Sequence, residues 1–120
     1  MTNDSQQADR FLIKCKENYF KGIRPANLTS KHLPDYKFLV NIAKDYFDNN
    51  KEVTFSEFFK EGQYFIELWA AHLILEYGNP DFQMKKRCLE IIEKYSTSTM
   101  DEIVAKEESD FLKSYYQTSN

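Results

Sequence analysis

The stretch FIELWAAHLILEYGNP, residues 65–80, decides the fold class. In a helix, successive residues are about 100° apart around the axis. Trp69 then lies on one side of the helix, Leu73 about a third of a turn away and Ile74 on the remaining side, so that apolar side chains surround the helix almost completely. Such a helix must be covered by other elements on several sides. The stretch therefore predicts a central helix, in which Ala70 and Ala71 let one neighbour approach closely.

The chain begins with a pattern typical of an amphipathic helix. This helix is expected to begin at Asp4 or Ser5 as its N-cap and to run to about Lys21, with Gly22 as its C-terminal stop. Residues 23–33 then form the longest irregular connection. The apolar spacing predicts one buried face on the first helix, made of Ala8, Phe11, Leu12, Cys15 and Tyr19.

Two further helices are predicted before the central one. The second begins near Pro34 and ends at DNN, residues 48–50. Thr54 and Glu57 fit a capping box, which predicts a short third helix closed by Gly62. The second helix is expected to bury Tyr36, Leu39, Val40, Ala43 and Phe47.

Two amphipathic helices follow the central helix. Asn79 as N-cap and Pro80 in the first turn predict a helix through Tyr95, and Thr99 with Glu102 fits a capping box for the last helix. The expected buried residues are Met84, Cys88, Ile91, Ile92 and Tyr95 on the first, and Met100, Val104, Phe111 and Tyr115 on the second.

Composition supports an all-α fold. The chain has only 3 Gly and 3 Pro, too few for the frequent tight turns of a sandwich or barrel. Its 120 residues fit one domain, residues 1–120, of five to six helices arranged as antiparallel hairpins around the central apolar helix. The polar N-terminus and the lack of an apolar run long enough to cross a bilayer predict a cytoplasmic protein without a membrane segment.

The sequence carries no motif for catalysis, a metal or a cofactor, so we expect a protein that is not an enzyme. Cys15 and Cys88 sit at apolar helical positions without ligand spacing and are expected to be buried thiols. His72 has Glu76 one turn further on, and we interpret the two as a pair that satisfies itself in the core. A catalytic or metal-binding role for His72 is the weaker alternative, because no ligand cluster completes a site.

The acidic last helix is the strongest candidate for a binding surface. Residues 61–120 contain 6 basic and 11 acidic side chains, against 10 and 8 in residues 1–60. A solvated face explains most such charge runs, and the alternative is docking of a basic partner with aromatic anchors. The candidate partner-binding residues are Glu102, Glu107, Glu108, Asp110, Tyr115 and Tyr116.

A basic run, KKR at residues 85–87, offers an alternative function in a nucleic-acid-associated regulatory protein. The net charge of −3 and the pI near 5.4 make nucleic acid an unlikely partner, because such binding depends on clustered Lys and Arg. A solvated helix face is the simpler interpretation of the run.

ELWAAHLILEYGNP, CLEIIEKYS and IVAKEESDFLKSYY resemble the helical hairpins of HEAT-like repeat domains found as small stand-alone bacterial proteins. The likeness runs from about Ala8 to Tyr116, and is carried by the packing residues Leu68, Trp69, Ala70, Ala71, Val104 and Ala105. It implies a curved scaffold that binds another macromolecule, and some such proteins are immunity proteins that neutralise bacterial toxins. The chain is short and its connection at residues 23–33 breaks the period, so a HEAT-like α-α superhelix and a compact bundle both stay open.

Together these observations predict a protein-binding module, in its most concrete form an immunity-type inhibitor that occludes a basic toxin or enzyme through an acidic surface. A homodimer is the other association left open, because Phe58, Phe59 and Phe82 add aromatic rings that so small a core cannot all accommodate.

Overall fold

The computed structural model describes residues 4–118, whose regular elements are all helical, without a strand in this part of the chain. The all-α fold is therefore confirmed. The main helices are α1 (Asp4–Lys21), α2 (Pro34–Asp48), α4 (Ile66–Tyr77), α5 (Phe82–Ser96) and α6 (Glu102–Thr118), with one α-helical turn, α3 (Glu52–Phe55), and the 3-10 segments η1 (Leu28–Ser30) and η2 (Ser56–Lys60).

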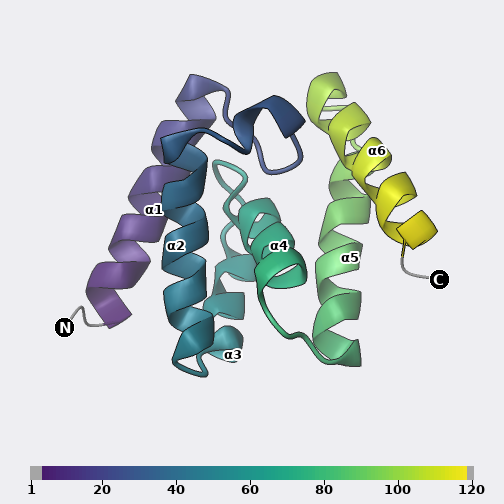
Figure 1. Ribbon diagram of the computed structural model, residues 1–120. Helices are drawn as coiled ribbons and strands as arrows, with labels where there is room; N and C mark the ends of the chain where they lie inside the picture. Colours follow the sequence, from purple (N-terminus) through teal and green to yellow (C-terminus); the bar gives the residue numbers. More distant parts are fainter. Residues whose placement is uncertain (1–3, 119–120) are drawn as a thin grey trace.

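The five longer helices lie side by side in chain order, from α1 at one end of the row to α6 at the other (Figure 1). Successive helices pack on each other, and α1 also reaches α4. The radius of gyration is 13.5 Å, close to the value of about 13.6 Å expected of a compact chain of this length. The arrangement is consistent with a compact all-α bundle.

Helix α4 is the centre of the core, as its sequence predicts. Every residue from Ile66 to Ile74 is buried, and Trp69 is 0% exposed. The indole of Trp69 packs edge-on against the ring of Tyr36 on α2, with ring centroids 5.0 Å apart. Truncation of a buried ring of this size typically costs about 3–5 kcal/mol, so this contact is a main support of the fold.

A second group of aromatic side chains joins α1, α2 and the short helices α3 and η2. The ring of Phe55 lies 5.0 Å from that of Phe11 and 5.2 Å from that of Tyr46, and Phe58 packs 4.4 Å from Phe11. Phe58 is thus buried, Phe59 is half-buried and only Phe82 of the three surplus rings is largely exposed. The core therefore holds more aromatic rings than the sequence analysis allows for.

Three predicted helix starts are wrong, because in each case a different residue occupies the position before the helix. Thr54 lies inside α3, whose N-cap is Lys51, so the predicted capping box with Glu57 is not formed. The side chain of Asp81 accepts a hydrogen bond from the Met84 backbone N–H at 2.8 Å, and caps α5.

For α5 the expected starting residues, Asn79 and Pro80, both precede the helix. The last helix is capped by Asp101, which accepts from the Val104 backbone N–H at 3.1 Å, and the proposed cap residue Thr99 lies before it. The stop at Gly22 is confirmed, since its φ of 74° lies in the left-handed region that glycine tolerates.

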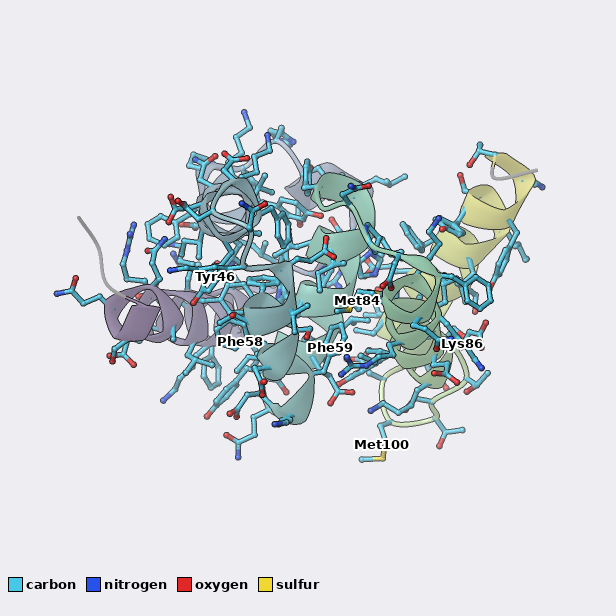
Figure 2. The ribbon with its side chains drawn as sticks, turned by 90° about the horizontal axis from the view of Figure 1, so that it is seen from below. Tyr46, Phe58, Phe59, Met84, Lys86 and Met100 are labelled. Carbon is cyan, nitrogen blue, oxygen red and sulfur yellow. The ribbon has the colours of Figure 1, made fainter. Side chains whose placement is uncertain are left out.

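Two residues assigned to buried faces are exposed. Tyr19 is 42% exposed and packs instead beside Phe20 and Tyr64 on the surface. Met100 is 92% exposed because α6 begins after it, and Figure 2 shows its side chain projecting at the outer edge of the molecule, whereas Met84 lies among the helices. Both buried cysteines agree with the sequence analysis.

Candidate functional site

A groove with a volume of about 560 Å³ lies at the α6 end of the molecule. One wall is the connection between α1 and α2, the base is the C-terminal end of α4, and the other wall is α6. The lining residues are Ala26, Asn27, Leu28, Thr29, Lys31, Leu75, Glu76, Glu107, Asp110, Phe111, Ser114, Tyr115 and Thr118.

The α1–α2 connection is held in place by its own polar residues. The hydroxyl of the buried Tyr36 donates a hydrogen bond to the Pro25 carbonyl at 2.7 Å. Asn27 caps η1, because its side-chain oxygen accepts from the backbone N–H of Ser30 at 3.0 Å. This wall of the groove is therefore an ordered turn with fixed side chains.

Glu107 fastens α6 to that connection. The guanidinium of Arg24 donates two hydrogen bonds to the two carboxylate oxygens, both at 2.8 Å, and the amide of Asn27 adds a third at 2.6 Å. Burial opposes ionisation of Glu107, but the bonds from Arg24 and Asn27 outweigh it and lower the pKa of the carboxyl. Arg24 in turn has a raised pKa, chiefly through its hydrogen bond to Glu107.

Glu108, the next residue, fastens α6 to the central helix. Its Oε1 lies 2.5 Å from Nε2 of His72, and the side chains are 1% and 0% exposed. The two atoms form a hydrogen bond in which either the imidazole donates from Nε2 or the carboxyl of Glu108 is the donor. The rings of Phe111 and His72 pack edge-on, with their centroids 4.4 Å apart.

The prediction that His72 pairs with Glu76 is therefore wrong, because its partner is Glu108. The two residues share a helix, yet the imidazole turns to Glu108 on α6, 36 positions along the chain. Glu76 instead forms an ion pair with Lys31, whose Nζ lies 3.0 Å from Oε1. Its other oxygen, Oε2, is buried and has no hydrogen-bond partner within residues 4–118.

The predicted acidic face on α6 is only partly exposed. The prediction that Glu108 lies on the surface is wrong, and Glu107 is engaged by Arg24. Asp110 is exposed and pairs with Lys106 at 2.9 Å, while Glu102 is exposed at the helix start.

Of the two predicted aromatic anchors, Tyr115 is half-buried and lines the groove, and the hydroxyl of Tyr116 donates to Glu93 at 2.9 Å. The structure therefore brings Glu107, Asp110 and Tyr115 together in the groove. It leaves Glu102 and Tyr116 outside the lining.

The basic run at residues 85–87 lies on the exposed side of α5. Lys85 and Lys86 line a shallower hollow of about 340 Å³ that also contains Glu90 and Glu93. Arg87 turns to the other side, where its guanidinium lies 5.0 Å from the centre of the Phe59 ring. Equal numbers of opposite charges in the hollow make it a weak site for phosphate.

Sequence reasoning missed Arg24, Lys31 and the residues of the α1–α2 connection. No periodic pattern marks them, because they lie between the two helices and meet their partners on α4 and α6 only in the folded chain. The signal present in the sequence is the density of polar turn residues around Pro25, Asn27 and Thr29, which is typical of ordered loops.

Two further kinds of feature are absent from the part of the chain that the structure describes. Within residues 4–118 no three His, Cys, Asp or Glu side chains gather closely enough to hold a metal ion. None of the helices in this range has the length and apolar character needed to cross a bilayer.

Comparisons with protein-family models, with curated proteins and with solved structures found no match. The resemblance to HEAT-like hairpin domains and to immunity proteins thus stays a prediction.

Proposed function

We propose that this protein is a non-catalytic protein-binding module, and that the groove beside α6 binds a segment of another protein that carries basic and apolar side chains. In its most concrete form it is an immunity-type inhibitor that covers a basic toxin or enzyme. The observation that carries the proposal is the lining of the groove, which combines apolar side chains with the three carboxylates of Glu76, Glu107 and Asp110. Lys31 pairs with Glu76 inside the groove, while Arg24 and Lys106, which pair with the other two, lie outside its lining.

The apolar part of the lining suits a peptide segment. Leu28 is 79% exposed at one lip, and Leu75, Phe111 and Tyr115 form apolar surface deeper in the groove. In protein–protein binding a few buried anchors, aromatic side chains among them, supply most of the free energy, and the surrounding apolar contacts exclude water. Carboxylates among them favour cationic partners and speed their approach.

The groove, more than the whole acidic face of α6, is the surface that we assign to the partner. Glu108 is buried with His72, so it supports the wall and does not contact a ligand. Asp110 and Tyr115 keep their predicted role as partner-binding residues, and Glu107 holds the wall through Arg24. Occlusion of a basic partner then requires only that its segment fill the groove.

The test is a selection from a phage-displayed library of random peptides, followed by titration calorimetry on the enriched peptides. We expect them to contain Lys or Arg beside apolar residues. Ser114→Trp, which fills the groove, should weaken binding by about ten-fold or more, while Lys113→Trp on the neighbouring exposed position should not. Far-UV circular dichroism is used to check that both variants are folded.

Peptides without basic residues, or peptides that bind Ser114→Trp as well as the parent chain, would exclude the groove as the binding surface. Peptides whose affinity responds instead to substitution of Lys85 and Lys86 would move the site to α5.

A further inference from the structure

The three carboxylates of the groove differ in how many partners they already have. Glu107 accepts three hydrogen bonds from Arg24 and Asn27. Both carboxylate oxygens of the exposed Asp110 accept a hydrogen bond from Nζ of Lys106, at 3.2 and 2.9 Å. Glu76 has a single partner, Lys31, and its buried Oε2 has none among the described residues.

An unpartnered buried carboxylate oxygen is unfavourable, since it has lost water and gained no donor. The side chain of Glu76 is only 19% exposed, and the residue belongs to the last turn of α4, the end of a helix whose final carbonyl groups carry partial negative charge. Those groups repel an anion and attract a cation. Within that turn α4 carries no basic residue of its own.

Lys31 satisfies this position only in part. Its ammonium approaches Oε1 at 3.0 Å and leaves Oε2 unbonded. A guanidinium is planar and can donate to both oxygens of one carboxylate at once. The groove contains an example of that geometry, because Arg24 spans both oxygens of Glu107 at 2.8 Å each.

We propose that Glu76 is the receptor for an arginine side chain of the ligand, and that Lys31 occupies this receptor in the unbound protein and is displaced on binding. The inference rests on the proposed function for the source of the arginine, which is the basic segment of a partner protein. It adds two roles to the proposed function. Glu76 selects arginine over lysine, and Lys31 competes with the ligand and so lowers the affinity of the groove for it.

Displacement of Lys31 is inexpensive. Its side chain is 36% exposed, and Lys31 follows directly on the short η1 segment. Partly exposed lysine–carboxylate pairs contribute little free energy, whereas a two-bond guanidinium contact is stronger and better oriented. The exchange therefore favours an arginine ligand, and the competitor reduces apparent affinity by the fraction of molecules in which it is bound.

The first experiment uses small cations as probes, so that it does not depend on finding a partner. Ethylguanidinium is titrated into the full chain at constant ionic strength, and the backbone amide signals of residues 75–78 are followed by NMR. In Lys31→Met the ethylguanidinium concentration at the midpoint of the titration should fall about three- to ten-fold. The substitution removes the ammonium group that competes for Glu76 and keeps an apolar side chain of similar length. Ethylammonium should bind more weakly than ethylguanidinium by at least about three-fold.

Matched controls separate the site from general charge effects. Lys37→Met removes the same charge from an exposed position of α2 and should leave the midpoint unchanged. Glu76→Gln should abolish the response, and Lys31→Met should add nothing in that background. Glu102→Gln, at an exposed carboxylate outside the groove, should behave as the parent chain.

Equal midpoints for the parent chain and Lys31→Met would overturn the competitor, and a response that survives Glu76→Gln would overturn the receptor. These results are distinct from failure of the proposed function. If ethylguanidinium responds as expected but no peptide is selected, the groove binds guanidinium without serving a protein partner. If peptides bind but residues 75–78 give no response, the groove is used and this inference is wrong.

Discussion

The buried pair of His72 and Glu108 gives the most demanding prediction, because two separate substitutions should each be severe and their combination mild. Both side chains are essentially unexposed, and their contact of 2.5 Å links α4 to α6. His72→Leu leaves the carboxyl of Glu108 buried without its partner, and Glu108→Met leaves the imidazole in the same state. Each single change should lower the free energy of unfolding by about 3–5 kcal/mol.

The expected shift in melting temperature follows from the chain length. An unfolding entropy of about 2.1 cal/mol/K per residue gives about 0.25 kcal/mol/K for 120 residues, so each single variant should melt about 12–20 °C lower. The double variant removes both polar groups and leaves apolar side chains of similar size beneath Phe111. Its unfolding free energy should fall by no more than about 1 kcal/mol, or rise.

The assay is urea unfolding followed by circular dichroism, on the parent chain, the two single variants and the double variant. A matched cycle pairs His72→Leu with Glu76→Gln, the partner expected from the sequence. That cycle should be additive within about 0.5 kcal/mol. The reasoning is refuted if the double His72 and Glu108 variant loses the sum of the single losses, or if the cycle with Glu76 shows the larger coupling.

Three further predictions concern caps, cysteines and pH. Asp81→Ala should destabilise the protein by about 1 kcal/mol through loss of the α5 cap, measured by urea unfolding, while Asn79→Ala should change little. Cys15 and Cys88 should react with Ellman's reagent only as fast as the protein unfolds, because both are buried and burial raises the pKa of the Cys88 thiol to about 12. The lowered pKa of Glu107 should contribute stability that is complete above pH 4.5, its ordinary value, and lost as the pH falls through the folded-state value, so the difference between parent and Glu107→Gln should shrink from pH 7 to pH 3.

Each of these has a clear contrary result. A larger loss for Asn79→Ala than for Asp81→Ala would return the cap to the residue expected from sequence. Rapid labelling of either thiol under native conditions would place it near the surface. A difference between the parent and Glu107→Gln that grows towards acid pH would mean that the folded state raises the pKa of this carboxyl.

The sequence alone determined the class of the fold and the identity of its centre. The apolar circumference of residues 65–80 requires cover on several sides, and in the structure Trp69 is fully buried. Periodicity also located the face of α2, and Gly22 marked the end of α1. These features are local, because helical spacing and a left-handed stop depend only on residues a few positions apart.

Helix starts were less accessible to sequence, because several candidate caps compete within a few residues. Asn79, Pro80 and Asp81 are all acceptable near a helix start, and only the folded backbone shows that Asp81 bonds to Met84. Polar side chains near a terminus can each form such a bond, so propensity does not distinguish them.

The tertiary structure alone decided the partners of the charged residues, and with them the candidate site. Acidic residues on α6 look alike in the sequence, yet Glu108 is buried against His72, Glu107 is held by Arg24 and Asp110 stays on the surface. The physical reason is that the contacts of Glu108 with His72 and of Glu107 with Arg24 join residues 36 and 83 positions apart, so their existence depends on how the helices pack. The groove and the unpartnered oxygen of Glu76 arise from the same packing, so no local pattern in the sequence encodes them.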